Sequence, residues 1–303
     1  MHCLKSKPIY VEVPIHSKLD ALWEASQNPH LHEQWDLRFS SITYLTKKEN
    51  EAQQFTYTRT VGPFYKVEGW GKSIGSFQND NQRTSSLHFG TPQKLSPIRE
   101  GRGYWKYEQL DDSVKFLTQY DYDVNFGRVG KIVDKFVFRP LIGWATALSF
   151  DVLKRWLEKG ETPSSQYVRF FSTYMMTYAF AFIWMYQGLI PKIIGMHPAE
   201  LSMIGNVFSD RHALLVVMII GLLEVFFGLF WLFYRRKDHL FLVQMILFPL
   251  LTITAVISLP ETAIHPFNPV TFNLSLIILS VIGFMLSRDV PSAKSCLRKR
   301  RGV

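Results

Sequence analysis

Cysteine is almost absent from this sequence of 303 residues. The two cysteines, Cys3 and Cys296, stand at opposite ends of the chain. Neither a disulfide framework nor a thiolate metal site is therefore expected, and a reducing compartment suits both ends. The first fifteen residues also lack an apolar core of signal-peptide length, so we expect neither export nor a lipoprotein role for Cys3.

Motifs for nucleotide binding and hydrolysis are missing as well. The sequence has no dinucleotide-binding fingerprint, no paired-histidine zinc helix and no serine at a glycine-flanked turn. Gly71-Lys72-Ser73 ends like a phosphate-binding loop, but Lys66 stands where that loop requires its first glycine. The net charge of +9 includes no arginine-rich stripe with interleaved aromatics, so no nucleic acid partner is predicted. The catalytic residues stay unknown, no metal or cofactor is predicted, and a binding protein is favoured over an enzyme.

Charged residues are absent from long stretches of the second half. A helix needs roughly 20 apolar residues to cross about 30 Å of hydrocarbon. The ranges 170–190, 240–259 and 267–287 contain no Asp, Glu, Lys or Arg, and 212–234 contains only Glu224. These ranges predict an all-α bundle of four transmembrane helices, in a domain of residues 170–288.

The loops predict how these helices are oriented, because Lys and Arg accumulate on the cytoplasmic side of a membrane. Three basic residues, 235–237, follow the second predicted helix, and the tail 289–303 is basic. The first loop has only two basic residues, Lys192 and Arg211, and the third loop has neither Lys nor Arg. We therefore expect a multi-pass protein of the plasma membrane with both termini in the cytoplasm.

One ionisable residue, Glu224, is expected inside the bundle. Such a residue costs a few kcal/mol in hydrocarbon and is a functional candidate, for proton handling or for a contact to a bound head group. The alternative is a protonated glutamate bonded to a neighbouring helix. Gln244 and Asn273 are its candidate partners.

A second polar group is expected on the outer side of the membrane. It comprises Lys192, His197, Glu200, Glu261 and His265. Two histidines and two carboxylates are residue types that bind metals, but their spacing matches no ligand pattern. Solvated loop residues explain the group equally well, so no metal is predicted.

The first 160 residues show the pattern of a folded soluble domain. Ile9, Val11 and Val13 alternate with polar residues, which predicts a half-buried strand. A helix with Ser17 as its N-cap follows and is broken at Asn28-Pro29, and a short helix covers 31–35. Further strands are predicted at 41–45, 54–61, 64–77, 83–89, 101–110 and 114–125. A long helix over 128–159, interrupted at Pro140, closes the domain before a linker at 161–169.

This order of elements over residues 8–159 resembles the helix-grip fold of the START and polyketide-cyclase (SRPBCC) superfamily. The predicted fold class is an α+β helix-grip domain, an antiparallel sheet with a long C-terminal helix, followed by the four-helix membrane bundle. The resemblance implies an apolar cavity between sheet and closing helix that holds a hydrophobic small molecule. Candidate lining residues are Trp35, Phe64, Trp70, Trp105, Phe116, Tyr120 and Trp144. The alternative is that these rings simply pack a core.

The first predicted loop carries a second resemblance. Residues 184–192, Trp-Met-Tyr-Gln-Gly-Leu-Ile-Pro-Lys, and the following segment 197–200, His-Pro-Ala-Glu, look like a signature of the DoxX-like membrane family. Residues 265–269, with Asn273 and Ser275, look like the family's entrance to its fourth span. The resemblance implies a four-helix membrane module. Named members of the wider family are linked to quinone-coupled oxidation of sulfur compounds, but no catalytic residue carries over, because no cysteine or cofactor motif matches a redox role.

Three functions stay open at this point. The first is a membrane-anchored binding protein whose cytoplasmic domain holds a hydrophobic small molecule or lipid near the inner leaflet. The second is a membrane subunit of a quinone-linked oxidoreductase, with a quinone as its cofactor. The third is a cyclase or hydratase, for which His88, Asp121 and Asp123 are candidates, although we expect both aspartates to face solvent. Expected partners are membrane lipid, a hydrophobic small molecule, and either a second copy or a partner membrane subunit.

Overall fold

The computed structural model describes residues 7–47, 51–63 and 65–300, which form two compact units. The first unit comprises the chain up to Tyr167 and returns from Pro291 onward, and the second is Val168–Val290.

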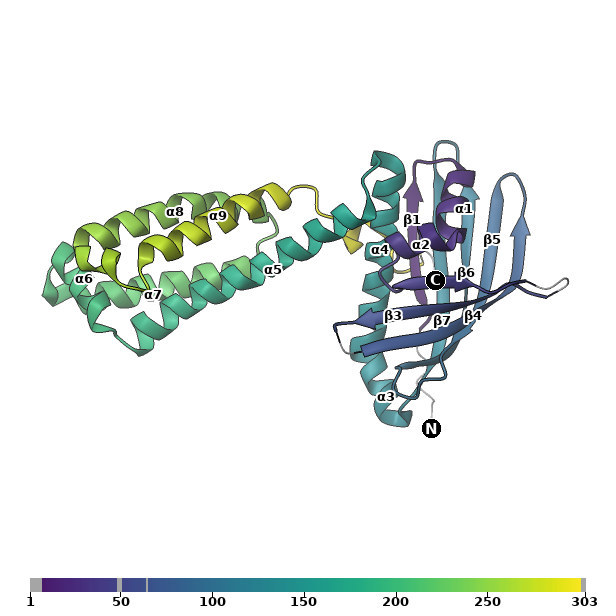
Figure 1. Cartoon of the computed structure of the whole chain (residues 1–303), viewed down its shortest axis with the longest axis horizontal. Coiled ribbons are helices and arrows are strands. Elements are labelled where there is room, and N and C mark those ends of the chain that lie inside the picture. Colours follow the sequence, from purple (N-terminus) through teal and green to yellow (C-terminus); the bar gives the residue numbers. More distant parts are fainter. Residues whose placement is uncertain (1–6, 48–50, 64, 301–303) are drawn as a thin grey trace. The chain divides into compact units, whose positions relative to one another are not determined.

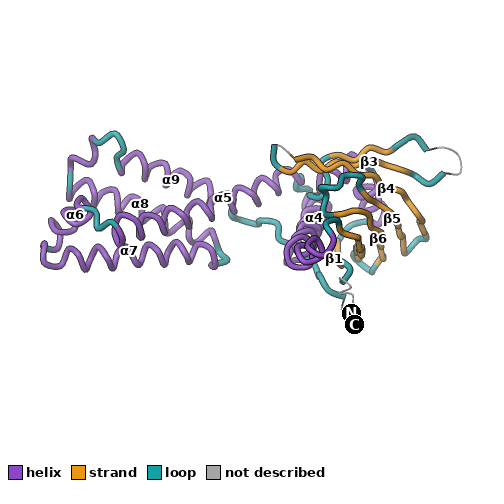
Figure 2. Tube along the Cα trace, turned by 90° about the horizontal axis from the view of Figure 1, so that it is seen from below, coloured by secondary structure: helices purple, strands orange, loops and turns teal. Residues whose placement is uncertain are grey.

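The first unit is built on one antiparallel sheet of seven strands (Figure 1). Its order is β1-β7-β6-β5-β4-β3-β2, so the strands from β2 to β7 form a meander and β1 pairs with β7 at its end. Successive side chains of a strand point to opposite faces of the sheet, and in β1 every second residue is buried. Figure 2 shows the strands arranged as an arc. The strands are β1 Ile9–Ile15, β2 Ser41–Tyr44, β3 Gln54–Val61, β4 Tyr65–Gln78, β5 Gln82–Gly90, β6 Ile98–Gln109 and β7 Val114–Val124.

Two short helices, α1 Leu19–Gln27 and α2 Pro29–Trp35, connect β1 to β2. The predicted N-cap of α1 is wrong: Lys18 occupies that position, and no side chain caps the helix. Asn28 does cap α2, since its side chain accepts from the backbone N of His30 at 3.1 Å. With Pro29 as the first helical residue, α2 begins two residues earlier than predicted.

The closing helix runs unbroken from Gly127 to Lys159. It consists of α3 Gly127–Val133, a π-helical segment η1 Asp134–Phe138, and α4 Arg139–Lys159. The predicted interruption at Pro140 is therefore wrong, and the irregularity lies in η1. A widened turn there accommodates the proline ring and its missing N–H. The second half of α4 packs on the domain, with Leu148, Phe150 and Leu153 fully buried. This arrangement confirms the helix-grip fold.

The C-terminal segment folds back onto the first unit, which the sequence did not indicate. After the short 3-10 helix η4 Ala293–Ser295, Leu297 pairs with Glu12 of β1 through two backbone hydrogen bonds of 2.9 Å. Cys296 is buried, and its Sγ donates to the backbone oxygen of Ala147 at 3.3 Å. The segment therefore extends the β1 edge of the sheet and packs against α4.

The second unit is helical and contains the apolar helices of a multi-pass membrane protein. Three helices are long and apolar enough to cross a bilayer, as is the pair formed by α5–η2 with α6, which bends by 88°. The closing helix of the first unit also passes this test, but half of its apolar window is buried inside the protein. The helices are α5 Pro163–Gln187, η2 Gly188–Ile194, α6 Pro198–Phe208, α7 Asp210–Phe233, α8 Lys237–Ser258, η3 Pro260–Ile264 and α9 Pro269–Leu286.

Glycines allow two of these helical segments to approach closely. A Cβ on Gly188 of η2 would lie 2.3 Å from the backbone oxygen of Gly221 of α7, and one on Gly221 would lie 2.7 Å from the oxygen of Gly188. Small residues permit such backbone contact in membranes, where packing rather than water drives association. The bundle core beside this contact is aromatic and includes Phe180, Trp184 and Trp231.

Candidate functional site

A partly enclosed cavity of about 150 Å³ lies in the first unit, between the concave side of the sheet and the helices. Aliphatic and aromatic side chains from β2, β3, β5, β6 and β7 form most of its wall, and Ile142 of α4 contributes from the closing helix. The lining includes one arginine and one histidine, Arg38 and His32, which α2 and the segment after it supply.

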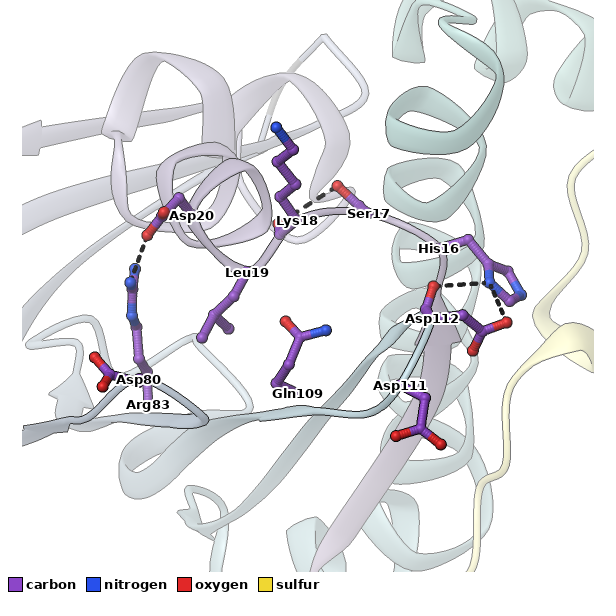
Figure 3. A pocket seen from close by; sticks show the side chains of 10 residues that line it. All are labelled: His16, Ser17, Lys18, Leu19, Asp20, Asp80, Arg83, Gln109, Asp111 and Asp112. Atoms are coloured by element: carbon purple, nitrogen blue, oxygen red, sulfur yellow. Dashed lines mark hydrogen bonds and ion pairs between the residues drawn. The ribbon is translucent and has the colours of Figure 1, made fainter.

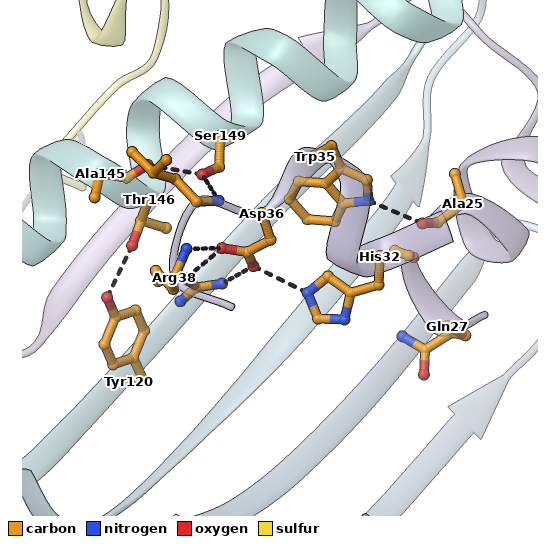
Figure 4. Close-up of polar contacts among 12 residues, drawn as sticks. Ala25, Gln27, His32, Trp35, Asp36, Arg38, Tyr120, Ala145, Thr146 and Ser149 are labelled. Carbon is orange, nitrogen blue, oxygen red and sulfur yellow. Dashed lines mark hydrogen bonds and ion pairs between the residues drawn. The ribbon is translucent and has the colours of Figure 1, made fainter. Parts of the chain in front are cut away.

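Asp36, which does not itself line the cavity, joins these two polar residues into one network (Figure 4). The Asp36 Oδ1 accepts from the backbone N of Arg38 at 3.0 Å and from its Nε at 2.9 Å. Oδ2 accepts from Arg38 Nη2 at 2.6 Å and contacts His32 Nε2 at 2.9 Å. His32 precedes Asp36 by one helical turn, so α2 and its C-cap place both groups on the same side.

Burial and charge act in opposite directions on this network. Burial alone would raise the pKa of the Asp36 carboxyl, but the Arg38 guanidinium and the hydrogen bond to His32 outweigh it and hold that pKa well below its usual range. The Asp36 side chain is 0% exposed, so the network is a buried carboxylate paired with a cation at the cavity wall. The Arg38 guanidinium also lies 5.5 Å from the ring centre of Tyr120, in the range of a cation–π contact.

Aromatic rings and tyrosine side chains surround the polar network and form part of the cavity wall. The His32 ring stacks on Trp35 at 5.0 Å and meets Trp105 edge-on at 4.9 Å. Tyr120 shares a hydrogen bond of 2.9 Å with Thr146 of α4, which connects the sheet to the closing helix. Burial raises the pKa of the Tyr57 hydroxyl to about 12, so this wall residue is neutral at physiological pH.

Of the aromatic candidates named from the sequence, Trp105 and Tyr120 line the cavity. Trp35 and Phe116 are fully buried in the adjoining core, where Phe116 stacks on Phe150 at 4.3 Å. Two others lie elsewhere: Trp70 is on the outer face beside His88, and Trp144 is on α4 outside the lining. Phe64 lies outside the described residues.

Sequence reasoning missed His32, Asp36 and Arg38. The available signal was the i, i+4 spacing of His32 and Asp36 at the end of a short helix that also carries Trp35. Nothing in the sequence indicated that Arg38, two residues later, would turn back onto Asp36.

The cyclase candidates lie away from the cavity. His88, Asp121 and Asp123 line a shallow depression on the other side of the sheet. Asp121 pairs with Arg139 at 2.7 Å, and Asp123 pairs with Arg99 at 2.8 Å. These carboxylates are already neutralised at the protein surface.

A second surface depression is wider and lies at the start of α1 (Figure 3). Two pairs of its side chains are in contact: Arg83 with Asp20, and His16 with Asp112, whose Oδ2 is 3.6 Å from the histidine Nδ1. It is open and polar, so it does not enclose an apolar ligand.

In the membrane unit, Glu224 of α7 pairs with Lys192 of η2, and neither predicted partner is in contact with it. The Lys192 Nζ lies 3.1 Å from Glu224 Oε2, as an ion pair without hydrogen-bond alignment, and 3.4 Å from Glu200 Oε1. Asn273 donates instead to Thr252 Oγ1 at 2.9 Å. Gln244 is fully buried, and neither of its amide atoms has a hydrogen-bond partner among the described residues.

The remaining members of the predicted outer group have separate positions. His197 caps α6, because its Nδ1 accepts from the backbone N of Ala199 at 3.3 Å. Glu261 lies in η3, and His265 follows directly after it. Within 7–47, 51–63 and 65–300, no three His, Cys, Asp or Glu side chains gather closely enough to hold a metal ion.

Comparison with known proteins agrees with this two-part architecture. Residues 181–281 match the model of the DoxX-like family. The uncharacterized membrane protein YndG of Bacillus subtilis is 47% identical over 188 residues, which cover 61% of this chain and 70% of YndG. That alignment is longer than the uninterrupted part of either unit, so it includes residues of both.

Solved structures align with the first half at low identity. A STAR-related lipid transfer protein from Xanthomonas axonopodis is 13% identical with a TM-score of 0.39, covering 52% of this chain and 90% of that one. The hypothetical protein jhp0584 from Helicobacter pylori is 16% identical with a TM-score of 0.40, covering 52% and 98%. The helix-grip assignment rests on the sheet order and closing helix described above. In this chain a helix-grip domain precedes a DoxX-like membrane module, and the chain belongs to the family of the Bacillus subtilis membrane protein YndG.

Proposed function

We propose that the helix-grip domain binds a small apolar molecule that carries one oxygen-bearing polar group, and that the membrane module anchors this domain at the cytoplasmic face of the plasma membrane. The observation that carries the proposal is the cavity itself, with a mostly apolar wall and with Arg38 and His32 held together by Asp36. Few polar groups in an otherwise apolar pocket are the usual way to orient a small ligand.

The size of the cavity favours a ligand of about one ring. An apolar cavity of roughly 150 Å³ is large enough for benzene, whereas pockets for drug-sized ligands measure about 300–1,000 Å³. A whole phospholipid would need the closing helix to move away from the sheet. A single aromatic ring or a short branched chain fits without such movement.

Arg38 is the group that selects the polar end of the ligand. Its bonds to Asp36 use Nε and Nη2, while a guanidinium has five N–H donors in all. A carboxylate or carbonyl oxygen would form stronger hydrogen bonds with these charged N–H groups than with neutral donors. Because Asp36 already balances the arginine charge, a carbonyl and a carboxylate are both acceptable partners.

The cytoplasmic location follows from the loops. Residues 235–237 between α7 and α8, and the basic C-terminal segment, would face the cytoplasm under the positive-inside rule. The helix-grip domain would then be on that side too, because it precedes α5 and receives the C-terminal segment.

Benzoate binding to the full-length protein tests the proposal. Saturation-transfer NMR in nanodiscs should detect benzoate on the wild type, and Leu87→Trp, which fills the cavity from β5, should abolish the signal. Ile74→Trp, on an exposed position of β4, is the matched control and should leave it unchanged. If benzoate and benzyl alcohol both fail to bind, or if Leu87→Trp binds like the wild type, the proposal is wrong.

The same protein should be extracted for bound molecules, which tests the quinone-linked alternative. A one-ring acid or ketone enriched over detergent controls, and lost in Leu87→Trp, supports the binding function. An isoprenoid quinone retained in Leu87→Trp would support a membrane subunit of a quinone-linked oxidoreductase instead.

The His32–Asp36 pair favours a second candidate function, acid–base catalysis in the same cavity. A histidine held by a buried carboxylate at hydrogen-bond distance is a common general base. His32→Gln should then leave ligand binding within about twofold of the wild type but stop chemical conversion of the bound molecule. Identical products from wild type and His32→Gln would exclude this function.

A further inference from the structure

The first half of the closing helix exposes a continuous apolar face. Val129, Ile132, Val133, Phe136, Val137 and Leu141 recur at helical spacing across α3, η1 and the start of α4. Their exposed fractions range from 49% to 70%, whereas Leu148, Phe150 and Leu153 further along the helix are fully buried. Residues 146–153 of the same helix are buried, so the exposed face precedes the part of the helix that packs in the core.

Basic residues run alongside this apolar face. Arg128, Lys131 and Lys135 are exposed and are spaced three and four residues apart, so they form one ridge. Each precedes an apolar residue of the stripe by one position, which places the ridge next to the stripe rather than opposite it. The C-terminal segment adds Arg298, whose Nη2 donates to the backbone oxygen of Pro140 at 3.1 Å.

The exposed face cannot turn inward, because the opposite side of the helix is anchored by a buried polar cluster. Asp134 of η1 is 3% exposed; it accepts from the Tyr122 hydroxyl at 2.7 Å and from Arg139 Nε at 2.8 Å. Arg139 Nη1 in turn donates to Asp121 at 2.7 Å. The widened turn of η1 thus directs the Asp134 side chain into the domain and leaves Phe136 and Val137 exposed.

We propose that this face of α3, η1 and the start of α4 lies in the head-group region of a bilayer that contains anionic lipid. An apolar stripe bordered by Lys and Arg is the pattern of helices that lie in the plane of the membrane interface. The basic ridge complements anionic head groups, at about fivefold in partitioning for each lysine near the surface. Only residues 160–162 separate α4 from α5, so the closing helix is tethered at a high effective concentration of bilayer. A weak affinity of the exposed face for lipid is therefore sufficient for contact.

Ile142, the cavity residue of the closing helix, directly follows Leu141 of the stripe. The bilayer contact would therefore place the cavity wall one helix thickness from the lipid. An apolar molecule could then pass between lipid and cavity without crossing bulk water. The bilayer contact itself does not depend on the cavity having a ligand.

Spin labels on the full-length protein in nanodiscs test the proposal. Single cysteines at Ile132 and Phe136, in a background with Cys3→Ser and Cys296→Ala, would carry a nitroxide whose collision rates with oxygen and a water-soluble nickel complex are measured. Both labels should be accessible to oxygen and protected from nickel. A label at Ile74 on β4, which is 53% exposed, is the control and should show the reverse.

Two outcomes would overturn the proposal. Nickel accessibility at Ile132 and Phe136 equal to that at Ile74 would show that the face is in water. Immobile labels protected from both oxygen and nickel would show that protein covers it, from the same or a second copy.

Charge provides an independent measurement. Lys131→Glu with Lys135→Glu should shift the Phe136 label toward the water-exposed population by at least about tenfold in phosphatidylglycerol-containing nanodiscs, and much less in purely zwitterionic ones. Added salt should weaken the wild-type contact in the same direction. Labels that respond equally in both lipids would refute the electrostatic part of the proposal.

Discussion

Replacing Arg38 by methionine should destabilise the helix-grip domain strongly, because it leaves the Asp36 carboxylate buried without its cation. The Asp36 side chain is 0% exposed and receives three of its hydrogen bonds from Arg38. Removing one partner of a buried ion pair lowers the free energy of unfolding by about 3–5 kcal/mol. The backbone N–H of residue 38 survives the substitution, and His32 stays on Oδ2, so we expect the lower end of that range.

The pH dependence should change sign in this variant. In the wild type the pKa of Asp36 is below its unfolded value, so its contribution to stability is present above about pH 4 and is lost as the pH falls further. Without Arg38, burial raises the pKa of Asp36 above the unfolded value. The folded state of Arg38→Met then binds more protons than the unfolded state, and its stability should rise as the pH falls from neutral toward 4.

Hydrogen exchange is the suitable assay, since the whole chain with its membrane unit does not unfold in a single two-state step. Peptides from β6 and β7 report opening of the first unit alone. A loss of about 3 kcal/mol should accelerate their exchange on the order of a hundredfold. Lys66→Met is the matched control: its ion pair with Glu68, at 2.8 Å, has side chains more than half exposed and should change exchange little.

A double variant separates the cost of the unpaired charge from the value of the pair. Asp36→Asn with Arg38→Met removes both charges and should recover most of the lost stability, since apolar or neutral replacements of buried pairs are often tolerated. Exchange in Arg38→Met within about threefold of the wild type would refute the reasoning. So would a double variant no more stable than the single one.

Three further predictions concern the C-terminal segment and the membrane unit. Burial raises the pKa of the Cys296 thiol to about 12, so maleimide should label it slowly at pH 8. Leu297→Pro, which removes one of the two hydrogen bonds to β1, should accelerate this labelling as measured by peptide mass spectrometry. Lys192→Met should lower the melting temperature of the purified protein because Glu224 loses its cation. Adding Glu224→Gln should restore most of the lost melting temperature. Equal melting temperatures of the single and the double variant would contradict the ion pair. Gly221→Val should reduce the yield of folded protein more than Lys192→Met does, because the valine side chain would meet the η2 backbone.

The secondary structure of both halves was predictable from local pattern. Strict alternation in β1 and long uncharged runs in the second half are properties of neighbouring residues, so they can be recognised without knowing the fold. The order of elements was enough to identify the helix-grip domain. The segment 184–200 was enough to identify the DoxX-like module, which the family match at 181–281 confirms.

The errors came where an element's neighbours decide its geometry. Pro140 is compatible with a continuous helix because η1 widens the turn before it. No pattern in the sequence predicts such a π-helical turn. Glu224 was expected to reach Gln244 or Asn273, but the approach of Gly188 and Gly221 brings Lys192 to it.

The sequence by itself determined the element order of the first unit, the long apolar helices of the second and the presence of an apolar domain core, because these depend on hydrophobic periodicity and on the length of apolar runs. It did not predict α6, which occupies part of the expected first loop. The tertiary structure alone decided which polar residues face the cavity, which half of the closing helix is exposed, and where the C-terminal segment docks. Those features depend on contacts between residues far apart in the chain, such as Leu297 with Glu12 and Tyr122 with Asp134, and on how each helix is rotated against the sheet. A periodic pattern specifies that a helix has two faces, but only the packed domain determines what each face meets.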